Sequence, residues 1–485
     1  MDANDALLPR DKLLRDTFTP AETTLFTTIL TTSAVVFWLA APRSYWLLGF
    51  FLIVGCLTPM ILKLHEHTHP FFVDRLWIKF WWVTAPGWLV FSQYVIGLFR
   101  NPLYSISVEG ERFLALQDSS PWLPVSTGSG DAWLTVAGYL ALLLIAVNLF
   151  FVPKSRAFFE RMMPWLCTLA VLVGLFGLVQ NALGLKAPFL TPGTGRSDFY
   201  AFFPYDGHWA AFAILWTSAC FAMALLTTRY EDSPPFVESS GPFYLAGGLL
   251  LGFSGVLVEA PEAGALLIFV TSILLLIFAV HFTRSRKDPH RTALVALSGF
   301  LAVAAFVTGL IRLFRASPEF TERAELWQCA GRLFTERPVF GWGMDSFGHL
   351  LPFFGSDLLH GRHYERAGSD ALQFLAEFGV FGVLAFLIML AALVIRYFSG
   401  RHDIQLTNHI LIGCVALLLL AVVDTPFMSP TVTFSFFMLF FTALRWADLS
   451  RKRVDEVDAG RPVLVTPESK RNVPFYMNKQ EEKVK

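Results

Sequence analysis

The sequence predicts an all-α polytopic membrane protein with about twelve transmembrane helices and a large helical extracytoplasmic loop between the ninth and tenth. Hydrophobic residues occupy 54% of the 485 positions and charged residues only 16%, whereas a soluble domain carries about 25% charge. Apolar runs recur at the length of roughly 20 residues that a helix needs to cross a hydrocarbon core about 30 Å thick. One polar segment, 313–370, is far longer than the other connections between these runs.

The apolar runs give the order of the predicted spans. The hinge at 258–264 is a short turn, and if it is not a turn the count falls to eleven. An even number of spans places both termini on one side of the membrane. The twelve predicted spans lie at 22–40, 45–63, 77–99, 132–151, 164–184, 208–227, 242–258, 263–282, 292–312, 371–396, 408–424 and 427–446.

Lysine and arginine set the predicted orientation, because the cytoplasmic loops of membrane proteins carry an excess of both. The short loops on the side of the N-terminus, with the N-terminal stretch, hold 16 of them, against five in the short outer loops. Basic segments at 284–291 and 445–453 lie on the same side. Both termini are therefore predicted to be cytoplasmic. The predicted organisation is a cytoplasmic N-terminal segment 1–21, transmembrane helices one to nine in 22–312, an extracytoplasmic loop 313–370, helices ten to twelve in 371–447, and a basic, disordered cytoplasmic tail 448–485.

Charge and cysteine content exclude several classes of protein. Lys plus Arg and Asp plus Glu each number 38, so the chain is not a basic nucleic-acid binder, and membrane lipids are its expected surroundings. The five cysteines form no C-x-x-C pair, and we expect no metal site. The spans hold few ionisable residues, which disfavours a secondary transporter.

The long segment 313–370 is predicted to fold as a small helical cap. Thr321 is a plausible N-cap, and the apolar residues after it recur at helical spacing. Pro338 ends that helix, and a glycine-rich turn at 340–344 follows it. A second short apolar run occupies 349–359. Long loops in compact proteins are usually functional, so this segment is the first place to look for chemistry.

Seven arginines and no lysine occupy residues 312–368. The planar guanidinium suits bidentate recognition of phosphate better than an ammonium does, which favours a lipid-linked diphosphate as the ligand. The alternative is that these arginines form solvated ion pairs with the glutamates of the same segment. The arginines are Arg312, Arg315, Arg323, Arg332, Arg337, Arg362 and Arg366, and the glutamates are Glu319, Glu322, Glu325, Glu336 and Glu365.

Three ordered motifs in and after this segment resemble the O-antigen ligase and polysaccharide polymerase superfamily. They are an R-x-x-x-W helix at 323–327, a P-x-x-G-x-G turn at 338–343, and S-D-x-L-Q-x-x-x-E-x-G-x-x-G at 369–382. Within these motifs the resemblance singles out Trp327, Gly341, Gly343, Ser369, Glu377 and Gly379 as motif or structural residues, with Glu377 capping or anchoring its helix.

The resemblance implies a metal-independent membrane glycosyltransferase that uses no cofactor. Such proteins transfer or polymerise glycan from an undecaprenyl-diphosphate-linked donor at the outer face of the bacterial inner membrane. A ligase uses lipid A core as the acceptor, and a polymerase uses another lipid-linked saccharide. Two alternatives stay open: a non-catalytic family member, and a transporter or flippase of lipid-linked glycans.

The resemblance also implies site residues. Arg323, Arg315 and Arg366 would bind the diphosphate, with Arg196 as a further candidate. At the hinge where the family often has S-R-G, this chain has Pro-Glu-Ala, with Glu262 in the middle. Its carboxylate would repel a phosphate unless an arginine neutralised it, and Arg315 or Arg196 would then take over the missing role.

Besides the hinge, this chain departs from the family pattern at the base that accepts the proton of the acceptor hydroxyl. The family histidine aligns with Gly368, and glycine cannot act as a base. His363 is the predicted replacement, with His360 as a further candidate, and Asp370 would orient the acceptor or the base.

Two further outer segments carry weaker signals. The segment 192–209 offers Arg196, Asp206 and His208 to a cavity, although its aromatic residues also suit anchoring at the membrane interface. The loop 100–131 is predicted to form a re-entrant or capping turn without assignable chemistry.

Overall fold

The computed structural model describes residues 18–39, 45–68, 73–108, 111–117, 120–127, 132–185, 199–228, 235–284, 289–315, 319–355, 364, 366–398 and 405–458. In this part of the chain the helices are α2 (Pro20–Leu39), α3 (Tyr45–Gly55), α4 (Leu57–Thr68), α5 (Val73–Leu98), α6 (Ala132–Phe151), α7 (Arg156–Ala182), α8 (Asp206–Leu226), α9 (Gly241–Phe253), α10 (Pro261–Arg284), α11 (Arg291–Arg315), α12 (Glu319–Glu336), α13 (Phe347–Phe354), α14 (Asp370–Phe398), α15 (Gln405–Val423) and α16 (Pro430–Asp458). Short 3₁₀ turns are η2 (Phe236–Glu238), η3 (Ser254–Val256) and η4 (Pro426–Met428).

The protein is a multi-pass, almost entirely helical membrane protein, which confirms the predicted class. Each of the twelve predicted spans falls on helix, and among the described residues ten helical segments are long and apolar enough to cross a membrane. The second span combines α3 and α4. The two predicted spans that fall short of those criteria are α5, whose first turns carry Asp74, Arg75 and Lys79, and α9, which has 13 residues before η3 begins.

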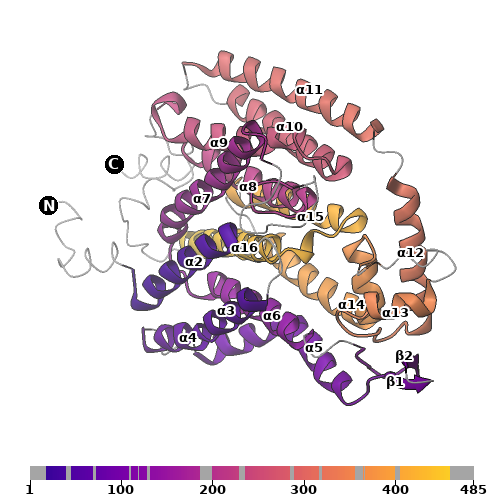
Figure 1. Ribbon diagram of the computed structural model, residues 1–485. Helices are drawn as coiled ribbons and strands as arrows, with labels where there is room; N and C mark the ends of the chain where they lie inside the picture. Colours follow the sequence, from indigo (N-terminus) through magenta and orange to yellow (C-terminus); the bar gives the residue numbers. More distant parts are fainter. Residues whose placement is uncertain are drawn as a thin grey trace.

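The loop after α5 differs from the prediction, because it contains a β-hairpin. Strand β1 (Leu103–Val108) pairs antiparallel with β2 (Glu111–Leu116), with Tyr104 opposite Ala115 and Ile106 opposite Phe113. Figure 1 shows the hairpin at the same end of the molecule as α12 and α13, on the right of the view, while α2 begins at the left. The expected capping turn is therefore a strand pair.

Helix α8 lies at the centre of the bundle. All of its residues are buried, and it packs against α9, α10, α15 and α16. An α-helix that is apolar on every side must be enclosed by other helices. Trp209 and Trp216 of α8 donate their indole N–H groups to Ser254 and Ser435, so these large side chains are satisfied within the core.

A second, smaller core supports α12 and α13. It joins Leu326, Cys329, Ala330 and Leu333 of α12 with residues of the glycine-rich turn, α13 and the start of α14, including Trp342, Phe347, Leu350, Leu351 and Ala376. The predicted helix after Thr321 thus exists as α12, and the apolar run 349–359 contributes α13.

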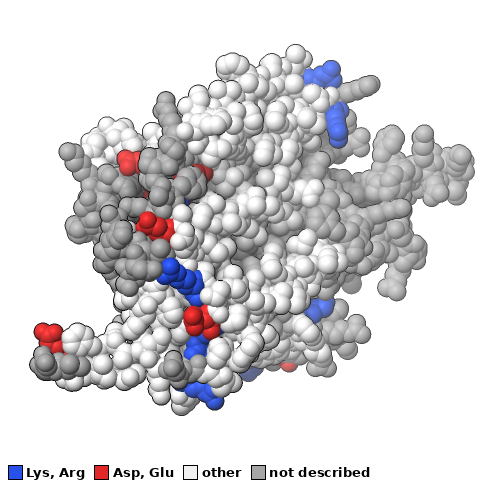
Figure 2. Space-filling view, turned by 90° about the vertical axis from the view of Figure 1, so that its right-hand side faces the viewer, with Lys and Arg blue, Asp and Glu red and all other residues white. Residues whose placement is uncertain are grey.

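Figure 2 shows a face of the molecule that is mostly free of charged side chains, with acidic and basic groups confined to a band and the margins.

Candidate functional site

The third motif contains an interruption of α14 at Gly379. Its backbone angles, φ 63° and ψ −171°, are not helical and lie in a region open essentially only to glycine. A break of this kind leaves backbone groups without their helical partners. The N–H groups of Val380 and Phe381 donate to the carbonyls of Pro338 (2.8 Å) and Val339 (3.1 Å). The first residues of the P-x-x-G-x-G turn therefore supply the acceptors that the broken helix lacks.

The same turn also returns hydrogen bonds to the other side of the break. The N–H groups of Trp342 and Gly343 donate to the carbonyls of Ala376 (3.2 Å) and Glu377 (2.8 Å). Gly341 (φ 67°) and Gly343 (φ 88°) both have left-handed backbones, and a Cβ at Gly341 would collide with the backbone of Glu377. The motif glycines thus allow two backbone segments to pair at close range.

Glu377 is also part of this structure. Its buried carboxylate accepts a hydrogen bond from the Gln373 amide (3.0 Å) and from the backbone of Asp345 and Phe347, where α13 begins. The predicted anchoring role agrees with this geometry, although the carboxylate anchors the start of α13 rather than the start of its own helix.

Several of the seven arginines hold the fold together instead of forming one cluster. Arg337 donates to the carbonyls of Ser120 (3.0 Å) and Leu123 (3.3 Å), and its guanidinium lies 4.5 Å above the Trp342 ring. Burial lowers the pKa of Arg337. Arg332 donates to the Phe354 carbonyl (3.1 Å), which joins α12 to α13.

Arg312 serves the hinge between α9 and α10. Its guanidinium donates to the carbonyls of Val256 (2.6 Å) and Val258, and it packs against Gly264. The carboxylate of Asp206 accepts from the N–H groups of Glu259 and Ala260 (3.2 Å) on the other side of this hinge. Backbone donors and acceptors of the hinge are therefore fixed by two charged side chains.

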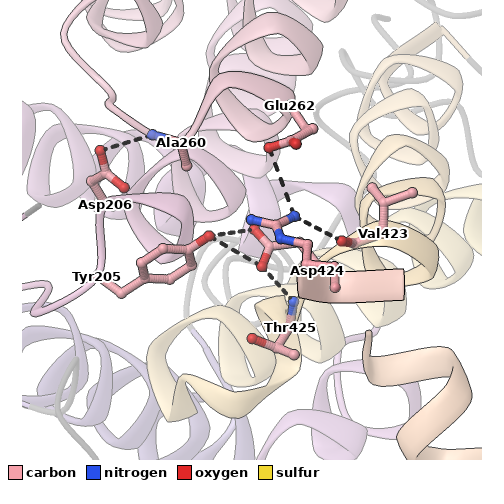
Figure 3. A network of polar contacts seen from close by, with 8 residues as sticks. Tyr205, Asp206, Ala260, Glu262, Val423, Asp424 and Thr425 are labelled. Atoms are coloured by element: carbon pink, nitrogen blue, oxygen red, sulfur yellow. Dashed lines mark hydrogen bonds and ion pairs between the residues drawn. The ribbon is translucent and has the colours of Figure 1, made fainter. Parts of the chain in front are cut away.

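A buried polar cluster lies where five segments meet. We define it as Tyr205, Asp206 and His208 at the start of α8, Glu262 at the start of α10, Arg323 of α12, Asp370 at the start of α14, and Asp424 with Thr425 after α15. Figure 3 shows most of these side chains converging from separate helices. The helix starts bring carboxylates to this point, where the helix dipole favours negative charge.

Arg323 is the central cation of the polar cluster. Its Nη1 donates to the Val423 carbonyl (3.1 Å) and lies 3.7 Å from Oε2 of Glu262. The Arg323 side chain keeps 15% of its surface exposed and that of Glu262 keeps 7%. The sequence predicted that Arg315 or Arg196 would neutralise the hinge carboxylate, and the structure assigns this pairing to Arg323.

Asp424 lies beside Arg323 and is held by neutral donors. The Tyr205 hydroxyl donates to its two oxygens at 3.2 and 3.1 Å, and the N–H of Thr425 donates at 2.8 Å. Burial raises the pKa of Asp424, while the charge of Arg323 opposes the shift. Burial and the charge of Asp424 raise the pKa of Tyr205, so its hydroxyl keeps its proton.

The start of α14 is tied to the end of α15. The N–H of Phe427 donates to the Asp370 carboxylate (2.6 Å), the N–H of Asp370 donates to the Asp424 carbonyl (3.0 Å), and the Ser369 hydroxyl donates to the Val422 carbonyl (2.8 Å). The start of α8 joins these contacts through His208, whose Nε2 forms a 3.0 Å hydrogen bond with the Thr425 carbonyl.

Arg366 and Gly368 lie just before the start of α14. The charge of Arg366 acts on both Asp370 and His208, and its guanidinium makes no hydrogen bond or ion pair in the described part of the chain. Gly368 (φ 68°) has space for a Cβ, which would lie 3.8 Å from Cγ of Arg323 and from Leu326. The position of the family histidine is therefore directly beside Arg323.

The remaining predicted residues are not all tested. Trp327 is half-buried, with its indole nitrogen buried and without a hydrogen-bond partner. Arg196, Arg362, His360 and His363 lie outside the described residues, as does the side chain of Arg315. Within the described ranges no group of three or more His, Cys, Asp or Glu is arranged to hold a metal ion.

Tyr205, Asp424 and Thr425 were not predicted as site residues from the sequence. A usable signal was present, because Asp424-Thr425-Pro426 interrupts two apolar spans with a polar turn at the same end of the molecule as the large loop. Glu262 was recognised as unusual, but its partner was not.

Comparison with known proteins assigns this region to a family. A search of the curated proteins found no match to the chain. Residues 248–387 match the family model described as O-antigen ligase. This range begins in α9, contains the hinge, Glu262, Arg323, the glycine-rich turn and Gly379, and ends within α14. Over residues 248–387 the chain is therefore similar to the O-antigen ligase family.

Proposed function

We propose that the protein transfers glycan from an undecaprenyl-diphosphate-linked donor to a saccharide acceptor at the outer surface of the bacterial inner membrane. The O-antigen ligase match supports glycan transfer of the ligase or polymerase kind. The single observation that carries the proposal further is the convergence of Arg323 with the starts of α8, α10 and α14, beside the charge of Arg366.

The chemistry requires cations at the leaving group. A bond forms between the acceptor oxygen and the anomeric carbon, and the bond from that carbon to the diphosphate oxygen breaks. The lipid diphosphate leaves with the electron pair, so fixed positive charge near its phosphates stabilises the transition state. Val423 and Glu262 hold Arg323, and part of its side chain is exposed. Arg366, whose guanidinium makes no hydrogen bond or ion pair in the described part of the chain, lies beside the polar cluster. Arg315 and Arg196 remain additional candidates.

The acceptor hydroxyl must also lose a proton. We propose His363 as its base, because Gly368 removes the family histidine and leaves space beside Arg323 into which a neighbouring side chain can enter. Asp370, fixed by the N–H of Phe427, would orient the acceptor or the imidazole. The second candidate function, a non-catalytic family member, is favoured by the same glycine.

The test is Arg323→Ala in the full-length protein, with Arg332→Ala as the control on the same helix. We expect Arg323→Ala to reduce glycan transfer by about a hundredfold or more, as loss of a preorganised charge at a leaving group does. The amount of the variant protein in the membrane should equal that of the wild type. Arg332→Ala should retain transfer, because its guanidinium contacts Phe354 and not the polar cluster. Normal product from Arg323→Ala refutes the diphosphate role.

Deletion of the gene distinguishes the possible reactions. Loss of long chains with single repeats remaining indicates a polymerase, and accumulation of carrier-linked full-length polymer indicates a ligase. Unchanged glycans would favour the non-catalytic alternative, and a defect in movement of lipid-linked glycan across the membrane would favour a flippase.

A further inference from the structure

The hinge carboxylate Glu262 has an unusual environment. The residue is 8% exposed, and neither of its carboxylate oxygens accepts a hydrogen bond in the described part of the chain. It forms an ion pair with the guanidinium of Arg323 at 3.7 Å, which is beyond hydrogen-bond length. A buried carboxylate normally has its lone pairs filled by donors, because leaving them empty is costly.

The other carboxylates of the polar cluster differ from Glu262 in this respect. Asp424 accepts from Tyr205 and Thr425, Asp370 accepts from Phe427, and Asp206 accepts from the hinge backbone. Each of these has donors from the protein itself. Glu262 is the carboxylate whose two oxygens both lack such donors among the described residues, so its partner is expected to come from elsewhere.

The hinge holds Glu262 firmly in place. Asp206 fixes the N–H groups of Glu259 and Ala260, and Arg312 fixes the carbonyls of Val256 and Val258. These contacts determine where α10 begins, one residue before Glu262. The backbone of the hinge thus places Glu262 beside Arg323, and the ion pair at 3.7 Å directs its carboxylate toward that guanidinium.

We propose that Glu262 binds donor groups on the first sugar of the lipid-linked donor, next to the diphosphate that Arg323 holds. This inference rests on the proposed function. In a glycosyl diphosphate the hydroxyl or amide hydrogens of the first sugar lie close to the phosphate, as Glu262 lies close to Arg323. Two acceptor oxygens on one carboxylate match two neighbouring donors on a sugar ring. Glu262 is then a residue that determines sugar specificity.

The experiment compares two classes of probe on the full-length protein in lipid nanodiscs. The first is farnesyl diphosphate, which carries no sugar. The second is farnesyl diphosphate bearing glucose or N-acetylglucosamine. The wild-type protein should bind at least one sugar-bearing probe about tenfold to a hundredfold more tightly than the bare diphosphate, as expected for charge-assisted hydrogen bonds. Equal affinity for all three probes overturns the inference.

The key variant is Glu262→Gln, which keeps the shape and removes the charge. It should lose the preference for sugar while binding farnesyl diphosphate as tightly as the wild type or more tightly, because a repelling charge beside the phosphate has gone. The matched control is Glu259→Gln, an exposed carboxylate of the same hinge, which should behave as the wild type. Retained sugar preference in Glu262→Gln, or a parallel loss for all probes, overturns the inference.

Further variants separate this inference from the proposed function. Arg323→Ala should weaken binding of both probe classes, and unchanged binding of farnesyl diphosphate would contradict the proposed function itself. Glu262→Asp keeps the negative charge beside Arg323 but shortens the side chain. The variant should therefore fold as the wild type does. Its sugar preference should still fall, and an undiminished preference would contradict direct contact with the sugar.

Discussion

The break in α14 and the polar cluster achieve order by different means. At the break in α14 the glycine-rich turn and the helix satisfy each other through backbone hydrogen bonds in both directions. In the polar cluster, side chains from distant parts of the chain meet, and neither Glu262 nor the adjacent Arg366 makes a side-chain hydrogen bond to the described residues. The comparison teaches that the most recognisable motif residues build the scaffold, while the capacity to bind a ligand lies mainly in less recognisable residues beside them.

The largest expected effect tests the scaffold. Gly379→Ala should destabilise the protein by about 3 kcal/mol or more, because the backbone angles exclude other residues and the new Cβ would collide with the Val339 carbonyl. Thermal unfolding of the purified protein in detergent measures this loss. Gly299→Ala in α11 is the control, since a Cβ there meets nothing within 4 Å. Equal stability of the two variants would break the distinction between scaffold and cluster.

The second effect tests the polar cluster. Arg366→Ala should lower glycan transfer by about tenfold to a hundredfold, the usual cost of losing hydrogen bonds to a charged group. Its melting temperature should stay within the error of the wild type, because Arg366 makes no hydrogen bond or ion pair in the described ranges. Arg366→Lys should recover part of the activity. A large loss of stability with Arg366→Ala would place this residue in the scaffold instead.

The third effect concerns pH. Since burial raises the pKa of Asp424 above its unfolded value, the folded protein retains a proton that the unfolded chain has released. This contribution is present at low pH and is lost as pH rises through the folded-state pKa, with a slope of at most about 1.4 kcal/mol per pH unit. Asp424→Asn should flatten the decline of melting temperature between acidic and neutral pH. An unchanged pH profile would show that Asp424 is ionised throughout.

The smallest effect sharpens the picture of the scaffold. Trp342→Phe should cost about 1 kcal/mol, because it removes the 2.8 Å hydrogen bond from the indole N–H to the Leu333 carbonyl but keeps a ring beneath Arg337. Thermal unfolding measures the loss, and glycan transfer by the folded protein should be normal. A selective loss of transfer without loss of stability would mean that the turn takes part in catalysis.

Much of the fold was predictable because membrane helices follow a simple rule of length and apolarity. The hairpin was missed although Tyr104 and Ile106 alternate with serines at the period of a strand. A short strand pair is a weak signal beside long apolar runs. The existence of α12 was also predictable, because helical spacing is a local property, but Thr321 is not its N-cap, since the helix begins two residues earlier at Glu319.

The site was predictable only in part. Arg323 and Asp370 were named from motifs and Arg366 from the arginine-rich segment, and the structure brings them to one end of the bundle. The pairing of Arg323 with Glu262 depends on how α10 and α12 fold together, and no local pattern records it. The arginine cluster expected from composition is divided, because Arg312, Arg332 and Arg337 bind backbone carbonyls of the fold.

The break at Gly379 has a consequence for biogenesis. Gly379 lies within a helix apolar enough to span the membrane, and its neighbours obtain hydrogen bonds from residues 338–343. Unpaired peptide groups in lipid cost several kcal/mol each. During insertion, α14 therefore cannot settle into its final form until residues 338–343 have folded against it, so folding of that segment and maturation of the helix are a single coupled event.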